Sequence, residues 1–121
     1  MTVTVYGIPN CDQIRKTRRW LDQHGIDYRF HDYRTEGLDA ATRQDWGRRT
    51  GLDSLINRRG TTWRRLDATQ QAAAASPATA IALLQAHPAL IKRPVITTSQ
   101  RPDALQVGFS DEALRSFLLP A

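Results

Sequence analysis

The stretch Val3–Arg19, V-T-V-Y-G-I-P-N-C-D-Q-I-R-K-T-R-R, decides the fold of this protein. It opens with β-branched and aromatic residues, which favour a short strand. Gly7, Pro9 and Asn10 interrupt that pattern and predict a turn. From Asp12 onward, Ile14, Thr17, Leu21 and His24 fall on one helical face, with arginines and Lys16 on the other. The stretch therefore predicts a strand, a turn and an amphipathic helix.

The only cysteine of the chain, Cys11, falls between the turn and the helix. The unpaired N–H groups and the positive end of the dipole at a helix N-terminus favour a thiolate over a thiol. A thiolate attacks sulfur, phosphorus or arsenic centres. A free cysteine can equally serve as a small buried hydrophobic residue. The position alone leaves both interpretations open, a reactive nucleophile and a structural thiol.

Length, charge and histidine spacing narrow the class of protein. A chain of 121 residues suits one domain with its own core. The net charge of +5 suits an anionic small molecule or nucleic acid. Nucleic-acid binding is not expected as the main function, because the sequence has no zinc-finger, RNA-recognition or aromatic-interleaved basic motif. The three histidines share no ligand spacing with the cysteine, so we expect no metal site.

Targeting signals and cysteine usage predict a cytoplasmic location. No stretch approaches the roughly 20 apolar residues of a membrane span, so we expect no membrane association. The N-terminus lacks the basic, apolar and small-residue order of a signal peptide. A single unpaired cysteine fits a compartment in which thiols stay reduced.

The chain after the first helix predicts a parallel pair of strands and then a helical block. Gly25 is a natural end for the helix, and alternation from Ile26 through Phe30 to about Tyr33 predicts a second strand. A strand, a helix and a strand in this order favour parallel pairing. Further helices are predicted between Asp39 and Gly51, over Asp67–Ala75, and from Ser76-Pro77 to His87, with a compact, mainly helical segment over Leu52–Asp67.

The C-terminal third predicts a hairpin and a last helix. Val95–Thr98 has strand composition, and Pro94, which cannot donate a ladder hydrogen bond, fits its first position. Leu105–Val107 predicts a short antiparallel partner. Ser110 predicts the N-cap of an amphipathic helix whose buried face carries Leu114 and its helical neighbours. The whole order is β-α-β, a helical block, then β-β-α.

This order, with a cysteine after the first strand and a proline opening the third, resembles the thioredoxin-like fold. The motifs Y-G-I-P-N-C, N-R-R-G-T-T-W-R-R-L, L-I-K-R-P-V and V-G-F-S-D-E resemble the arsenate reductase and Spx superfamily, most closely its YffB-type arsenate-reductase-like branch. The resemblance covers nearly the whole chain. It implies one α/β domain over 1–121 with a mixed four-stranded sheet flanked by helices. The thioredoxin-like core would span 1–37 and 88–121, and an inserted helical subdomain about 38–87.

The resemblance also implies a site and its chemistry. In the glutaredoxin-coupled arsenate reductases, the cysteine matching Cys11 attacks the oxyanion, and glutathione then attacks the adduct. Arginines hold the anion, which suits their bidentate geometry and permanent charge. Glutathione is thus the implied co-substrate, glutaredoxin a possible partner, and no cofactor is expected to stay bound. The implied site residues are Cys11 as nucleophile, Arg93, Arg59 and Arg58 as anion-binding residues, and Asn10 and Pro94 as structural neighbours, with the Arg93–Pro94 bond in cis.

Four positions depart from the patterns that the resemblance brings. The histidine that precedes the cysteine in arsenate reductases falls on Gly7, and their third arginine aligns with Gly108. Their middle-segment arginine aligns best with Asn57, although Arg58 or Arg59 could substitute after a small shift. The second cysteine of the C-x-x-C switch in Spx regulators falls on Ile14. These departures favour a glutathione-dependent thiol or oxyanion reductase over a dedicated arsenate reductase. The alternative is a non-enzymatic Spx-like regulator that binds RNA polymerase or a redox partner.

Overall fold

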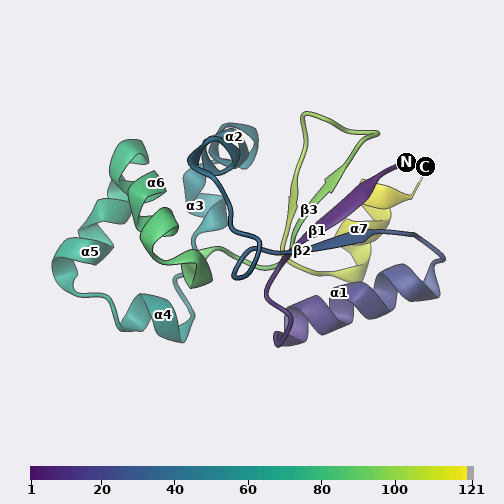
Figure 1. Cartoon of the computed structure of the whole chain (residues 1–121), viewed down its shortest axis with the longest axis horizontal. Helices are drawn as coiled ribbons and strands as arrows, with labels where there is room; N and C mark the ends of the chain where they lie inside the picture. Colours follow the sequence, from purple (N-terminus) through teal and green to yellow (C-terminus); the bar gives the residue numbers. More distant parts are fainter. Residues whose placement is uncertain (120–121) are drawn as a thin grey trace. The chain divides into compact units, whose positions relative to one another are not determined.

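The computed structural model describes residues 1–119 and divides into two compact units (Figure 1). The first unit is Met1–Glu36 together with the chain from Arg93 onward, and the second is Gly37–Lys92. The helical insertion was expected over about 38–87, and the helical unit extends from Gly37 to Lys92. Residues 120 and 121 of the predicted domain lie outside the described part. Within residues 1–119, no helix combines the length and apolar character needed to cross a bilayer.

A mixed four-stranded sheet forms the centre of the first unit. Its strands are β1 (Val3–Gly7), β2 (Arg29–Asp32), β3 (Val95–Thr98) and β4 (Gln106–Val107), in the order β2-β1-β3-β4. β1 pairs parallel with β2 and antiparallel with β3, and β3 pairs antiparallel with β4. The sheet predicted from the sequence is therefore confirmed, although β2 and β4 are both shorter than predicted.

Helix α1 (Asp12–Gln23) follows the first turn and ends as predicted, with Gly25 in the left-handed region at φ 65°. The N–H of Ile26 donates to the Leu21 carbonyl at 3.0 Å, so this residue completes the helix end instead of starting β2. The face predicted to carry Ile14, Thr17, Leu21 and His24 is the buried one, with His24 half-buried at its end. The prediction omitted Trp20, which is 4% exposed on the same side of the helix and has the His24 ring stacked on it at 3.9 Å.

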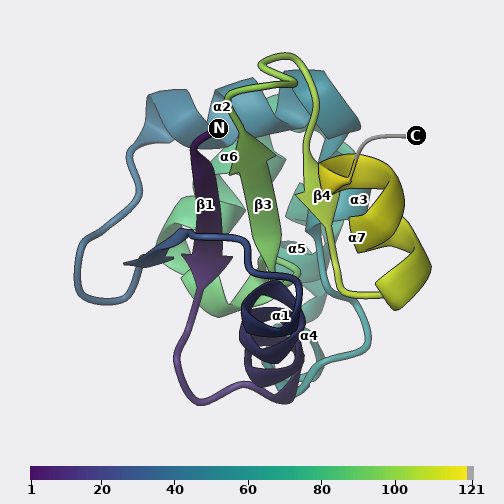
Figure 2. The same cartoon turned by 90° about the vertical axis from the view of Figure 1, so that its right-hand side faces the viewer.

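The first unit has one apolar core, which α1 shares with the C-terminal helix α7 (Asp111–Leu118) (Figure 2). The two helices are joined by a hydrogen bond of 2.6 Å from Trp20 Nε1 to the Asp111 carboxylate. Ser110 caps α7 as predicted, because its hydroxyl accepts from the Ala113 N–H. Packing at both helices thus fixes the position of α1 on the sheet. The sheet residues in this core are Val3, Val5 and Ile96.

The second unit is helical, and its caps follow the sequence closely. Asp39 accepts from the Thr42 N–H, and Asp67 forms a capping box with Gln70, as these residue types predict. Ser76 occupies the predicted N-cap position, but its hydroxyl makes no capping bond. The helices are α2 (Ala40–Thr50), α3 (Leu52–Leu55), α4 (Thr61–Arg64), α5 (Ala68–Ala72) and α6 (Pro77–Ala86), with short 3₁₀ turns at η1 (Ala73–Ala75) and η2 (Pro88–Leu90).

Backbone pairing joins the middle of the second unit to its C-terminal end. The N–H of Asn57 donates to the Leu90 carbonyl, and the N–H of Lys92 donates to the Leu55 carbonyl, each at 2.7 Å. These bonds surround an isolated antiparallel bridge at Ile56. The pairing holds the arginine-rich turn after Asn57 beside the end of the unit at Lys92.

Candidate active site

Cys11 is the N-cap residue of α1, as the sequence predicts. Its backbone is extended, at φ −132° and ψ 132°, and its carbonyl accepts the first helical bond from the Arg15 N–H at 2.9 Å. The N–H groups of Ile14 and Gln13 face the sulfur without reaching the alignment of a full capping bond. The sulfur therefore lies where the first turn of the helix concentrates positive potential.

The surroundings of Cys11 favour the thiolate. Partial burial raises the pKa of the thiol, but the N–H groups of Ile14 and Gln13 and then the Arg93 guanidinium lower it, and the net pKa lies below its usual value. The neighbouring Asp12 carboxylate pairs with Arg15 at 3.2 Å. With 86% of its side chain exposed, that carboxylate is well solvated and opposes the thiolate only weakly.

Arg93 reaches the sulfur from the segment that enters β3. The Arg93–Pro94 bond is cis, as the resemblance implies, and Pro94 is buried. The Pro94 carbonyl accepts from the Gly108 N–H at 2.8 Å, which ties this segment to the end of β4. Arg93 itself is half-buried and acts on Cys11 by its charge and a polar contact.

Gly7 and Ile14 explain why no histidine precedes the cysteine. A Cβ atom built on Gly7 would lie 2.3 Å from Ile14 Cδ1, and Ile14 is fully buried. The isoleucine thus fills the space that a side chain at position 7 would need. The two departures from the related families are therefore one structural feature, a close approach of β1 to α1.

Gly108, at the position of a third arginine in arsenate reductases, has a backbone that favours glycine. Its φ is +86°, in the region that residues with a Cβ rarely adopt. An arginine could not be placed here without backbone strain. The anion ligand is therefore absent from this position for a conformational reason as well.

A basic pocket of about 280 Å³ lies in the second unit. Within it, Arg58 is already engaged, because it pairs with Asp53 at 3.0 Å and lies over the Trp63 ring at 5.3 Å. The side chains of Arg59 and Lys92 form no ion pair with any acidic residue in 1–119. These two cations are the ones available to an anion. The residues that line the basic pocket are Asp53, Ile56, Asn57, Arg58, Arg59 and Lys92.

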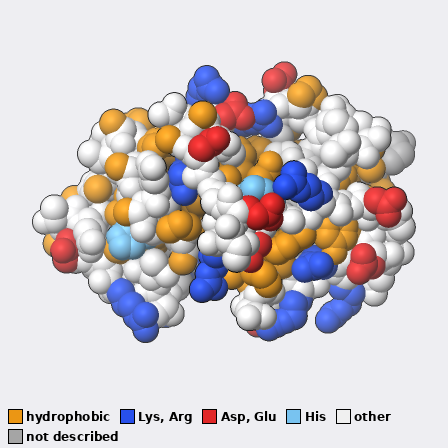
Figure 3. Space-filling view, in the orientation of Figure 1, with side chains coloured by type: hydrophobic (Ala, Val, Ile, Leu, Met, Phe, Trp, Pro, Cys, Tyr) orange, Lys and Arg blue, Asp and Glu red, His pale blue; other side chains and the backbone are white. Residues whose placement is uncertain are grey.

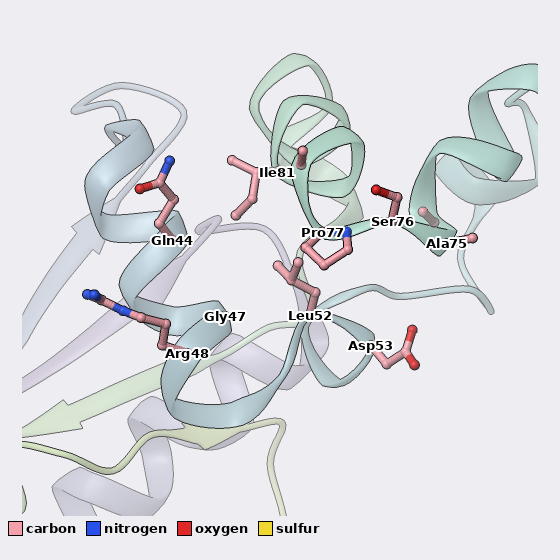
Figure 4. A pocket seen from close by; sticks show the side chains of 11 residues that line it. Gln44, Gly47, Arg48, Leu52, Asp53, Ala75, Ser76, Pro77 and Ile81 are labelled. Carbon is pink, nitrogen blue, oxygen red and sulfur yellow. The ribbon is translucent and has the colours of Figure 1, made fainter.

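A larger pocket of the same unit, about 560 Å³, lies between α2, α3 and α6 (Figure 4). Leu52, Pro77 and Ile81 give it an apolar wall, and Gln44 and Arg48 border it along α2. Its lining contains neither cysteine nor histidine. Pocket volume therefore does not identify the reactive site, which is defined by the position of the Cys11 sulfur.

On the face shown in Figure 3, Lys and Arg side chains lie apart from one another, separated by acidic, hydrophobic and other groups. Arg48 and Arg49, for example, both pair with Asp45, at 3.0 and 2.8 Å. This face does not present the continuous positive surface that a nucleic-acid backbone would need.

The structure brings together Cys11 and Arg93 of the predicted site, and it places Arg59 and Arg58 in the basic pocket of the other unit. Asn10 is an exposed turn residue. The sequence did not identify two further residues that the structure places at the site or in the basic pocket. Tyr33 is 3% exposed and electrostatically coupled to both Cys11 and Arg93, and Lys92 lines the basic pocket. A tyrosine directly after the second strand and a lysine beside Arg93 were the signals that could have identified them.

Known proteins match the chain over almost its entire length. Residues 6–117 match the ArsC family, and the chain belongs to this family. The solved YffB protein is 40% identical with a TM-score of 0.86, covering 94% of this chain and 96% of that one. A solved arsenate reductase (ArsC) related protein from Brucella melitensis is 41% identical with a TM-score of 0.76, covering 99% and 97%. The global transcriptional regulator Spx of Listeria innocua is 32% identical over 118 residues, covering 96% of this chain and 86% of the relative.

Proposed function

We propose that this protein is a glutathione-dependent thiol reductase in which Cys11 is the nucleophile. The observation that carries the proposal is the placement of Cys11: its sulfur faces two helix N–H groups and the Arg93 guanidinium, which favour the thiolate. The chain has no second cysteine, so it cannot resolve an intermediate by itself. A second thiol must therefore come from outside.

The proposed reaction has two disulfide-exchange steps. The Cys11 thiolate attacks the glutathione sulfur of a mixed disulfide, the sulfur–sulfur bond breaks, and the substrate leaves as a thiolate that takes a proton from water. Cys11 is then joined to glutathione. A second glutathione thiolate attacks the glutathione sulfur of this adduct, which releases oxidised glutathione and restores the Cys11 thiolate. Glutaredoxin is an alternative source of that second thiol, and the reducing cytoplasm is the compartment that supplies both.

Arginines bind the carboxylates of glutathione in this proposal. Arg93 is placed beside the sulfur, and Arg59 has no acidic partner within the described residues. A guanidinium suits this task because it matches a carboxylate with two parallel hydrogen bonds. Lys92 supplies a second positive charge in the basic pocket, whereas Arg58 is already paired with Asp53.

Arsenate is a less suitable substrate for this site. Reduction of a multiply charged oxyanion needs several convergent donors at the attacking sulfur. Gly7 and Gly108 occupy positions at which the related reductases carry a histidine and an arginine. A side chain at position 7 would collide with Ile14, and the backbone at position 108 favours glycine. A mixed disulfide has neutral sulfurs and asks only for a thiolate, access and a good leaving thiol.

The test compares two activities of the full-length protein under the same conditions. Reduction of a small glutathionylated substrate and reduction of arsenate are each measured with glutathione and glutaredoxin supplied. We expect turnover of the disulfide, little or none of arsenate, and loss of the disulfide activity in Cys11→Ser. Efficient arsenate turnover that depends on Cys11, or disulfide reduction that survives Cys11→Ser, would contradict the proposal.

The similarity to Spx favours a second candidate, a regulator that binds RNA polymerase without catalysis. The 32% identical relative is named a global transcriptional regulator, and it matches 96% of this chain. Ile14 stands where the Spx switch has its second cysteine, so a regulator of this type could not form that disulfide. Co-purification of RNA polymerase with the protein, unchanged in Cys11→Ser, would favour this candidate over the reductase.

A further inference from the structure

A buried tyrosine at the end of β2 carries a hydroxyl that has no evident structural role. Tyr33 follows β2, and its side chain is 3% exposed. Its hydroxyl is closed off from solvent and reaches no partner at regular hydrogen-bond geometry among the described residues. Leaving such a group unpaired costs about 1–3 kcal/mol, so a site without a use for the hydroxyl would favour phenylalanine.

A backbone hydrogen bond holds Tyr33 at the end of β1 that leads to the turn before Cys11. The Tyr33 N–H donates to the Gly7 carbonyl at 3.3 Å, and Gly7 is the last residue of β1 before the turn to Cys11. Tyr33 therefore lies at the end of the parallel β1–β2 pair, where Gly7 is paired with Asp32. The pairing register of β1 and β2 therefore sets the position of Tyr33 relative to the turn that carries Cys11.

The groups that act on this hydroxyl are those of the active site. Burial raises the pKa of Tyr33, Arg93 lowers it by its charge and a polar contact, and Cys11 and Asp32 raise it. The phenol therefore stays protonated at neutral pH, and its oxygen can accept from a guanidinium N–H. Arg93 is also the charged residue that lowers the pKa of Cys11, so the same guanidinium acts on both the phenol and the sulfur.

We propose that Tyr33 is a positioning residue of the active site, whose buried hydroxyl holds the Arg93 guanidinium against the Cys11 thiolate. The hydroxyl oxygen is a neutral acceptor, so it orients the arginine without neutralising it. A carboxylate in the same place would compete with the thiolate for the positive charge. The use of that thiolate rests on the proposed function; the positioning itself does not.

The test measures the rate of iodoacetamide alkylation of Cys11 against pH in the full-length protein. Tyr33→Phe keeps the ring and removes the oxygen. We expect alkylation below the thiol pKa to slow by about two- to tenfold, the size of effect expected when one polar contact to the guanidinium is lost. Tyr28→Phe is the matched control, because the Tyr28 hydroxyl accepts from Arg18 Nε at 2.9 Å within the same unit. It should leave the alkylation profile unchanged.

A double-mutant cycle separates positioning from a direct effect on the sulfur. If Tyr33 acts through Arg93, Tyr33→Phe should change the alkylation rate little in an Arg93→Ala background. An equal effect in both backgrounds would overturn the proposal. An unchanged rate in Tyr33→Phe alone would do so too, and a faster rate would mean that the phenol competes with the thiolate for Arg93. Melting temperatures of all variants show that each remains folded.

A reciprocal measurement leaves Tyr33 in place. Tyrosine ionisation, followed by ultraviolet absorbance, should require a higher pH for one tyrosine in Arg93→Ala than in the wild type, because the positive charge beside that phenol is gone. An unchanged tyrosine titration would contradict the contact. Neither readout needs reductase activity, so a protein that fails as a reductase still tests this assignment.

Discussion

The close approach of β1 to α1 makes Gly7 intolerant of any side chain. An alanine Cβ at this position would lie 2.3 Å from Ile14 Cδ1 and 3.0 Å from Ile14 Cγ1. Carbon atoms in contact prefer about 3.5–4.0 Å. Ile14 is fully buried in the core under α1, so it has little room to move. We expect Gly7→Ala to destabilise the fold by about 1–3 kcal/mol, the usual cost of overpacking a core.

The identity of the clashing atom sharpens this prediction. Ile14→Val removes Cδ1 and should cost about 1 kcal/mol in the wild type. In the Gly7→Ala background the same change removes the worst contact, so it should cost less or even stabilise. We expect a coupling free energy of about 1 kcal/mol between the two substitutions, measured by urea unfolding of the four proteins.

Gly25→Ala supplies the matched control for this cycle. It also adds a methyl group to a glycine of the first unit, but nothing lies within 4 Å of the new Cβ, and its cost comes from backbone strain at φ +65°. Its effect should add to that of Ile14→Val. Additive free energies for Gly7→Ala and Ile14→Val would refute the reasoning, because the clash would then have been relieved elsewhere.

Three further predictions concern the thiol, the anion pocket and a helix cap. Arg93→Ala should slow alkylation of Cys11 about threefold or more below its pKa, since a charge-assisted contact is lost, whereas Arg19→Ala on the exposed face of α1 should not. Arg59→Ala should raise the KM for a glutathionylated substrate more than Arg58→Ala, and equal effects would remove the distinction based on the ion pair. Asp67→Ala should lower the free energy of unfolding by about 1 kcal/mol in urea, because it removes one half of a capping box.

Local signals in the sequence predicted most of the elements correctly. The β-branched start of β1, the glycine after α1 and the aspartates at Asp39 and Asp67 each determine a strand, an end or a cap within a few residues. The cysteine at the N-cap of α1 belongs to this group, since its position follows from the turn beside it. These features were predictable because the interactions that create them connect neighbours in the chain.

Features that depend on distant contacts were not predictable in the same way. Helical spacing did not identify Trp20 as a buried residue, because Trp20 is anchored by the hydrogen bond that it donates to Asp111, 91 residues away. The start of β2 shifted because Ile26 completes the end of α1 through Leu21. The role inferred for Tyr33 likewise depends on two other segments of the chain.

The most direct test of the central claim is the pH dependence of Cys11 alkylation in the wild type. With only one cysteine in the chain, the reaction reports a single site. The rate should reach half of its maximum at a pH below the value of about 8.5 typical of a free cysteine. In concentrated urea the midpoint should return to that ordinary value, because the helix N–H groups and Arg93 no longer surround the sulfur. A midpoint in the folded protein at or above that of free cysteine would contradict the assignment of Cys11 as an activated nucleophile.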